Sequence, residues 1–510
     1  MSASLAAEAR HAATGHPRRW VILGVLVVSL LLTVVDNTVL NVVSKTLADP
    51  RAGLGASQAE LEWSINAYTV VFAALLFSFG VLGDRYGRRR ILLIGLVLFG
   101  LASAASAYSH DPGQLIAARA LMGLAAAAVL PATLSIISMV FDKRERSRAI
   151  AVWSGTVGAG VALGPIVSGL LLKHFWWGSV FLINVPVVLL GVAGVLLVVP
   201  ESHDPAPGRL DIGGGLLSIA GLSALVFGII DGGEHGFGRP QVWLACGAGL
   251  ILLAAFVGWE RRSSTPSLEV TLFRNPRFSA ATLAVAIVFF SALGAFFFLP
   301  FYLQSVRGYS PLQAGVLVLP FAAAQLIFAP ASAVAVRRFG AKAVCAAGLG
   351  LTGAALASVL GIAVQTPVWV LAIIFFVQGA GMALVSPPAM ESVVSTLPRE
   401  RAGVGSAVVN TVRQVSGALG IAILGAVVTA AYRRDLEPAL GGLPPPLHRA
   451  ANESIAGAHA VADALGSGRG PLIAAADRSF VTALHWSAAV SAALAVVGVA
   501  AVLRWLPGRR

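Results

Sequence analysis

Long apolar segments separated by short polar ones dominate the hydrophobic pattern of this 510-residue chain. A helix needs about 20 mostly apolar residues to cross a bilayer. The segments are continuous rather than alternating, which excludes a membrane β-barrel. The pattern therefore predicts an all-α polytopic membrane protein with fourteen transmembrane helices. We place them at about 20–44, 59–82, 90–108, 113–139, 146–171, 178–199, 210–230, 240–259, 278–304, 311–336, 342–364, 368–390, 403–432 and 482–507.

The composition agrees with this prediction, because 57% of the residues are hydrophobic and 12% are charged. Soluble proteins carry roughly 25% charged residues, so a chain this apolar needs the bilayer as its solvent. The two cysteines, Cys246 and Cys345, lie in separate apolar segments and have no metal-ligand spacing. We read them as small core residues, and we expect neither a metal site nor a cofactor.

The distribution of basic residues predicts the orientation of the chain. With the N-terminus inside, the inner segments carry more than twice as many Lys and Arg residues as the outer loops. This bias marks the cytoplasmic side. We therefore expect cytoplasmic N- and C-termini in a bacterial inner membrane, with residues 1–19 as a cytoplasmic tail before a retained first helix. The bias also accounts for most of the net charge of +13, so nucleic acid is not an expected partner.

The two halves of the chain resemble each other at a fixed offset. Leu115, Gly123 and Pro131 return 256 residues later as Leu371, Gly379 and Pro387. Two six-helix halves of this kind are one of the common designs of membrane transporters. The repeat therefore predicts a first bundle (20–199), two linker helices (200–277) and a second bundle (278–510). Its one long outer loop, 433–481, is either disordered or a short helical cap, and we favour the cap.

Ionisable side chains inside the membrane are costly, so each one is a functional hypothesis. Asp36 lies well inside the first predicted helix, and Arg119 lies at a similar depth in the fourth. A nearby cation would hold a buried carboxylate in its charged form, so the proton on Asp36 could follow the substrate or the conformation. We expect Asp36 and Arg119 to carry the proton, and the alternative is a static structural ion pair.

Further polar residues inside the predicted helices are candidates for a substrate cavity. Arg413 lies near the middle of the thirteenth helix and needs a cavity or a partner. Each polar residue taken alone is more often a hydrogen bond between helices than a substrate contact. The candidates for the cavity are Asn41, Asn66, Tyr68, Gln325, Gln378, Asn410, Arg413 and Gln414.

Two further motifs point to a moving helix bundle. Residues 80–90 read GVLGDRYGRRR between the second and third helices, where glycines allow a tight turn and close helix approach. We predict a cytoplasmic gate from Gly80, Gly83, Asp84, Arg85, Gly87 and Arg88. The fifth helix has small residues at four-residue spacing and a proline that favours a kink, and these features suit close packing and rocking. Its motif consists of Gly160, Gly164, Pro165 and Gly169.

These motifs resemble those of the major facilitator superfamily, specifically its fourteen-helix drug:proton antiporters, along nearly the whole chain. The stretch 80–89 is similar to the loop motif of the superfamily, and Arg119 with Gly123 is similar to its fourth-helix motif. The fifth-helix motif is similar to the one associated with exporters. Asp36-Asn37-Thr38 resembles the first-helix signature of the fourteen-helix group, although Val35 stands where leucine is usual. Trp177, Phe181, Asn184 and Pro186 are similar to another mark of that group.

The resemblance implies a proton-coupled exporter of small lipophilic or cationic compounds that works by alternating access. The alternatives are an uptake symporter or a metabolite exporter of the same fold. A membrane-embedded enzyme or sensor is disfavoured, because no catalytic arrangement or soluble domain occurs. We expect a monomer driven by the proton gradient, and nothing in the sequence indicates an adaptor protein. Because Asp36 is the only acid deep in a predicted helix, we expect neutral or monovalent substrates rather than dications.

Overall fold

The computed structural model describes residues 16–142, 145–203, 211–263, 266, 268–396, 402–465 and 469–506, and every regular element in these ranges is a helix. The first half contains α2 (Arg19–Ala48), α3 (Gln58–Tyr86), α4 (Arg88–Ala107), α5 (Pro112–Val140), α6 (Arg146–His174), α7 (Ser179–Leu182) and α8 (Asn184–Val198). The linker helices are α9 (Ile212–His235) and α10 (Pro240–Arg262), followed by η1 (Val270–Arg274). The second half contains α11 (Pro276–Phe301), η2 (Tyr302–Val306), α12 (Pro311–Leu317), α13 (Leu319–Val359), α14 (Val368–Val394), α15 (Ala402–Leu436), η4 (Glu437–Ala439), α16 (Pro445–Glu453), α17 (Ile455–Leu465) and α18 (Arg469–Trp505).

Local sequence signals define the helix ends. Ser57 and Glu60 form a capping box at the start of α3, and Ser310 and Gln313 form another at the start of α12. Each such cap contributes roughly 1 kcal/mol by satisfying backbone N–H groups that lack a partner. Gly87 has a φ of 112°, which glycine adopts without strain, and it separates α3 from α4.

Eleven helices in the described ranges are long and apolar enough to cross a membrane, or twelve if the bent helix α3 is one span. The protein is therefore a multi-pass membrane protein. The 41-residue helix α13 contains a non-helical residue, Gly340, with a φ of 82°, between the two segments predicted at 311–336 and 342–364. The total of fourteen crossings stays a prediction.

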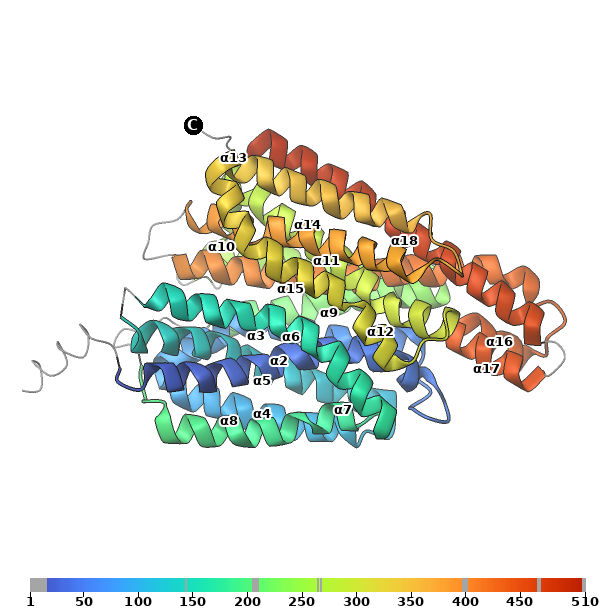
Figure 1. Cartoon of the computed structure of the whole chain (residues 1–510), viewed down its shortest axis with the longest axis horizontal. Coiled ribbons are helices and arrows are strands. Elements are labelled where there is room, and N and C mark those ends of the chain that lie inside the picture. Colours follow the sequence, from blue (N-terminus) through green and yellow to red (C-terminus); the bar gives the residue numbers. More distant parts are fainter. Residues whose placement is uncertain are drawn as a thin grey trace, which may run out of the picture.

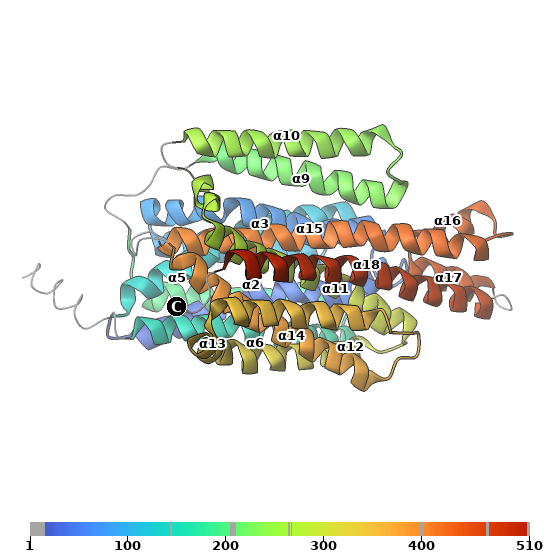
Figure 2. The same ribbon diagram turned by 90° about the horizontal axis from the view of Figure 1, so that it is seen from above.

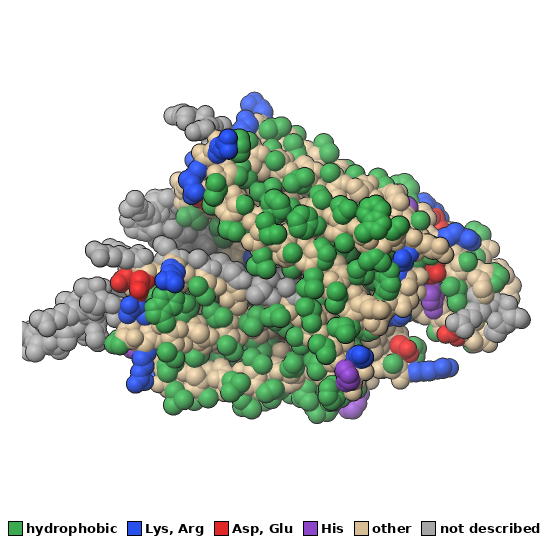
Figure 3. All heavy atoms as spheres, viewed as in Figure 1, with side chains coloured by type: hydrophobic (Ala, Val, Ile, Leu, Met, Phe, Trp, Pro, Cys, Tyr) green, Lys and Arg blue, Asp and Glu red, His purple; other side chains and the backbone are tan. Residues whose placement is uncertain are grey.

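The helices run side by side along the long axis of the molecule (Figure 1). We call the end where α2 begins and α18 finishes the terminal end, and the end with α16 and α17 the distal end. Figure 3 shows apolar side chains over the middle of one face and charged ones toward the two ends. Large apolar residues such as Leu197 (78% exposed) and Ile251 (70%) point outward. A soluble protein would rarely expose so much apolar surface, so this belt faces lipid.

The two halves contact each other near the distal end. The Lys45 ammonium at the end of α2 donates a hydrogen bond to the Gln304 carbonyl at 2.7 Å, and the Gln304 amide donates to the Val42 carbonyl at 3.1 Å. Helix α6 also packs against α12. Toward the terminal end, α13 and α18 slope away from the first half (Figure 1). The halves are thus joined distally and diverge toward the termini.

The linker helix α9 lies across the boundary between the halves. It packs against both α3 and α15, while α10 packs on the outside of α9 (Figure 2). Apolar residues of all three helices share one cluster: Ala59, Val70, Leu222, Val226, Ile230, Ala418 and Ala422. The linker is therefore part of the interface between the halves.

The long loop contains two short helices rather than an irregular chain. Helices α16 and α17 pack against each other and against α15 and α18 at the distal end. Ala451 and Ala458 are fully buried, and the Tyr432 hydroxyl donates a hydrogen bond to the Ala451 carbonyl at 3.3 Å. Of the two alternatives for the loop, the structure contains the helical cap.

Candidate transport site

A buried ion pair joins α2 and α5 inside the first half. The Arg119 Nη1 donates to the Asp36 Oδ2 at 2.5 Å, and both side chains are completely inaccessible to solvent. The Arg119 Nε also donates to the Ser64 carbonyl of α3 at 3.2 Å. Because removing either charge would leave the other unpaired in a dry interior, the pair is strongly interdependent.

A second set of contacts fixes the orientation of the pair. The Asn184 Nδ2 donates to the Asp36 Oδ1 at 3.0 Å and lies 2.9 Å from the Ser103 hydroxyl, which donates to the Phe181 carbonyl. On the other side, the Arg119 guanidinium lies over the Tyr68 ring, 4.6 Å from its centroid. Cation–π contact and charge-assisted hydrogen bonds therefore stabilise both charged groups.

The ion pair is separate from the cavity between the halves. That cavity has a volume of about 130 Å³ and is mostly apolar. Helix α2 contributes Thr38 and Val42 to it, and α6 contributes Pro165. Since Asp36 is only two residues from Thr38, α2 connects the ion pair on one side with the cavity wall on the other. The second half contributes Phe289, Ala292, Leu293, Phe296, Leu299, Pro300, Leu303, Gln304, Ala314, Val318, Phe321, Gln325 and Met382.

Gln325 is the predicted cavity residue that lines this space. Tyr68 instead contacts Arg119, and Asn66 is completely buried in α3, with neither amide atom hydrogen-bonded to another described residue. Arg413 lies over the ring of Phe289, 5.3 Å from its centroid. Gln378 and Gln414 are buried in α14 and α15, Asn410 is partly buried in α15, and the side chain of Asn41 lies outside the described part. A substrate role for these residues stays a prediction.

The predicted gate motif lies at the terminal end. Asp84 of α3 and Arg88 of α4 form an ion pair at 2.8 Å across the helix break at Gly87. Gly87 has a φ of 112°, which side chains rarely allow, and a Cβ there would also lie 2.6 Å from the Glu201 carboxylate, so the position favours glycine. The expected close approach at Gly80 and Gly83 does not occur in this conformation, because the nearest atoms to a Cβ would be at 3.8 and 3.9 Å, an ordinary contact distance. Arg85 stacks over the ring of Tyr86.

The fifth-helix motif packs closely, as its small residues predict. A Cβ on Gly160 would approach Val34 of α2 to 2.6 Å, and one on Gly164 would overlap Thr38. A Cβ on Gly169 would lie 2.6 Å from the Leu312 Cα of α12, in the second half. Helix α6, which contains Pro165, thus contacts both α2 and the opposite half.

Sequence reasoning missed three residues of the site. Asn184 belongs to a sequence motif, but nothing in the sequence connects it with Asp36, which lies 148 positions away. Ser103 and Gln304 gave no signal that distinguishes them from other polar residues in helices. These contacts run between helices, so a one-dimensional pattern does not contain them.

The fold and the site define the class of protein: the chain belongs to the Major Facilitator Superfamily, whose family model matches residues 21–421. It is therefore a membrane transporter. Among curated proteins it is 37% identical over 492 residues to the multidrug efflux pump LfrA of Mycolicibacterium smegmatis, covering 95% of this chain and 96% of that protein. It is 32% identical over 495 residues to the tetracenomycin C resistance and export protein of Streptomyces glaucescens, covering 95% and 91%.

Solved structures show the same fold at low sequence identity. A bacterial homologue of the human lysosomal transporter Spinster superposes with a TM-score of 0.64 at 16% identity, covering 97% of this chain and 99% of that one. The peptide transporter POT in complex with sulfate gives a TM-score of 0.65 at 15% identity, covering 96% of each chain. At this identity the likeness concerns the fold alone.

Proposed function

We propose that the protein exports small lipophilic or cationic drugs in exchange for protons. The observation that carries the proposal is the fully buried ion pair of Asp36 and Arg119. Asp36 lies on α2, the helix that also lines the cavity. Relatives similar over nearly the whole chain carry the names of a multidrug efflux pump and an antibiotic export protein, which supports the direction of transport and the substrate class.

Helix α2 links proton and substrate in this mechanism. A proton on Asp36 removes its charge, so Arg119 loses its ionic partner and keeps the Ser64 carbonyl and the Tyr68 ring. The resulting shift of α2 moves Thr38 and Val42 in the cavity wall. The protonation state of the pair thereby shifts the equilibrium between the two conformations that alternating access requires.

The orientation follows from the basic residues. We place the terminal end in the cytoplasm of a bacterial inner membrane, so the structure is closed on the outer side by Lys45 and Gln304. Asp36 takes a proton on the outer side as substrate leaves and releases it on the inner side. The proton gradient drives the cycle without a cofactor or adaptor, and the chain acts as a monomer.

The test compares Asp36→Asn with Asp49→Asn, a matched change at the distal end of α2. Inside-out membrane vesicles receive ethidium, tetraphenylphosphonium or puromycin, and an electrochemical proton gradient is imposed. We expect wild type and Asp49→Asn to accumulate at least one probe while the vesicles lose protons, and Asp36→Asn to do neither.

Wild-type activity in Asp36→Asn would exclude Asp36 as the coupling group. Absence of accumulation of all three probes by the wild type would contradict the substrate class. Proton-driven loss of probe from the vesicles would instead identify an uptake symporter.

A further inference from the structure

A second buried carboxyl group lies at the distal end of α3. Glu62 is 2% exposed, so an acid near the end of a membrane helix can be as fully enclosed by protein as Asp36. The sequence placed Glu62 near the end of an apolar segment, where an acid normally reaches water. Here α9 and α15 cover that end of α3, so the carboxyl group is enclosed.

Glu62 packs against the second half of the molecule. A Cβ on Gly425 of α15 would overlap the Glu62 carboxylate, so the carboxyl group touches the backbone of α15. Its hydrogen-bond donor is the Gln58 amide at 3.5 Å, and it has no ion pair among the described residues. A carboxylate closed off from water needs a proton or a cation, and no cation among the described residues lies within ion-pair distance of this one.

A small cavity of about 10 Å³ lies beside Glu62. Glu234 of α9 and Arg433 of α15 also line it, together with Gln58, Ala59, Ile230, Ala426 and Thr429. This volume holds about one water molecule and excludes a drug-sized ligand. The charged groups that line it are two carboxyl groups and one guanidinium, and the guanidinium belongs to Arg433 rather than to an ion-pair partner of Glu62.

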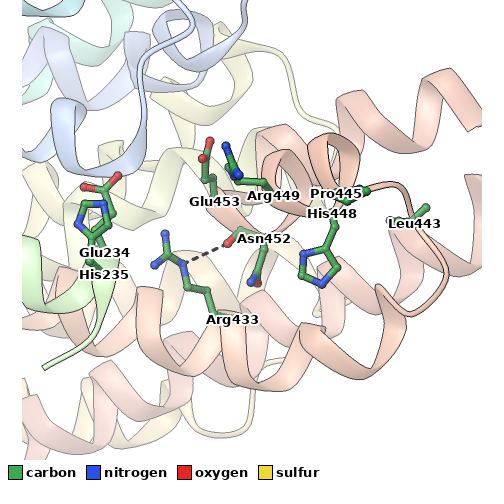
Figure 4. Close-up of a pocket in the computed structure, with 9 residues that line it drawn as sticks. All are labelled: Glu234, His235, Arg433, Leu443, Pro445, His448, Arg449, Asn452 and Glu453. Carbon is green, nitrogen blue, oxygen red and sulfur yellow. Dashed lines mark hydrogen bonds between the residues drawn. The ribbon is translucent and has the colours of Figure 1, made fainter. Parts of the chain in front are cut away.

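This small cavity adjoins a larger one that opens to solvent. The larger cavity has a volume of about 720 Å³ and shares Glu234 and Arg433 with the small one. In Figure 4, Glu234 and His235 face Arg433, Arg449 and Glu453 across it. The Arg433 Nε donates to the Asn452 carbonyl at 3.2 Å, which holds the guanidinium between the two spaces.

The remaining charged groups around Glu62 are satisfied or remote from the small cavity. Glu60, on the same helix, accepts from the Ser57 N–H of the capping box at 2.8 Å. His235 pairs with Asp231 at 2.8 Å, and His448 with Glu437 at 3.3 Å. One turn from Glu62 along α3, the buried Asn66 amide has no partner among the described residues.

We propose that Glu62 binds a proton from the outer side when the distal end closes and releases it when that end opens. This inference rests on the proposed function, because it assumes alternating access. Glu62 belongs to the first half and is covered by one helix of the second half and one linker helix, so separating the halves distally hydrates it. Closure buries it again and requires the proton. Low outer pH therefore favours the closed form, and its stabilisation is lost as outer pH rises.

The first experiment labels the unmodified protein with dicyclohexylcarbodiimide, which adds to protonated carboxyl groups in apolar surroundings. Purified protein in lipid nanodiscs is labelled at several pH values, and the modified residue is located by mass spectrometry. We expect labelling of Glu62 that declines as the pH rises, in wild type and Glu60→Gln alike. A detected but unlabelled Glu62 peptide at acid pH would overturn the proposal without depending on any variant.

The second experiment measures closure directly. Spin labels at Arg51→Cys and Gln365→Cys, both exposed at the distal end, report the closed and open populations in a chain with Cys246→Ala and Cys345→Ala. Over the pH range in which closure takes up a proton, we expect the closed-to-open ratio of the wild type to fall by up to about tenfold per pH unit, as for a single linked proton. In Glu62→Gln it should change less than about twofold over the same range.

Two matched variants separate this inference from the proposed function. Glu60→Gln should follow the wild type, because glutamine also completes a capping box. Asp36→Asn should lose export yet keep the Glu62-dependent response of closure to pH. A wild-type pH response in Glu62→Gln would overturn the role of Glu62 and leave that of Asp36 intact. Retained export in Asp36→Asn would overturn the coupling role of Asp36 and leave the role of Glu62 intact.

Discussion

The two halves share a backbone design but differ at the positions that carry charge. Gly123 packs on the Tyr68 carbonyl in the first half, and Gly379 packs on the Phe321 carbonyl in the second. At the position that corresponds to Arg119, 256 residues later, the second half has Phe375. The repeat therefore preserves close helix packing, while the buried ion pair belongs to the first half alone.

The second half instead has a lone cation near its middle. Arg413 stacks on Phe289, which lines the cavity, and no carboxylate among the described residues pairs with it. Phe289 lies 253 residues after Asp36, the offset that also relates Gly87 to Gly340, and both glycines have positive φ. The two halves thus share helix breaks and close packing contacts, whereas the positions equivalent to Asp36 and Arg119 hold phenylalanines in the second half.

Breaking the ion pair should have the largest effect. Arg119→Ala leaves Asp36 buried and unpaired, so we expect the free energy of unfolding to fall by about 3–5 kcal/mol. Chemical unfolding in detergent micelles measures this. The double variant Asp36→Ala/Arg119→Ala should lose less than Arg119→Ala alone, and an equal or larger loss would show that the charges do not depend on each other.

Removing the amide that orients the carboxylate should have a smaller effect. Asn184→Ala deletes the hydrogen bond to Asp36, and we expect a loss of about 1.5–3 kcal/mol, as for hydrogen bonds to charged groups. Unfolding measurements on Asn184→Ala and Asn184→Ser give the cost. An unchanged stability in both variants would mean that Arg119 alone holds Asp36.

The duplicated glycine contacts should give matching effects in the two halves. Gly123→Ala and Gly379→Ala each force a methyl group against a backbone carbonyl, so we expect each to lose about 1–3 kcal/mol. Thermal unfolding of the two variants side by side tests the match. A loss in only one half would show that the packing symmetry does not extend to energetics.

The gate motif should show the smallest effect on stability. Asp84 and Arg88 form a partly exposed ion pair across the break between α3 and α4, so Asp84→Asn should cost about 0.3–0.5 kcal/mol. The corresponding position of the second half, Arg337, has no acid to remove. A loss several times larger in Asp84→Asn would indicate that the motif holds the fold together in addition to the gate.

Much of this architecture could be predicted from the sequence because it depends on local patterns. The apolar segments locate the helices, and the helix breaks at Gly87 and Gly340 lie in the gaps between the segments predicted at 59–82 and 90–108 and at 311–336 and 342–364. The similar depth of Asp36 and Arg119 was enough to predict that they face each other. Burial of Glu62 could not be predicted, because it depends on how α9 and α15 cover α3. Asn184 likewise acquires its role through packing across the bundle.

The position of α9 has a consequence for exchange with the lipid. The interface between the two halves reaches the bilayer on two sides, and α9 with α10 occupies the side bounded by α3 and α15 (Figure 2). A hydrophobic molecule dissolved in the bilayer is therefore left with the opposite side, where α6 meets α12 and α13. The linker helices thus cover one side of the interface between two similar halves and leave the other side facing the membrane.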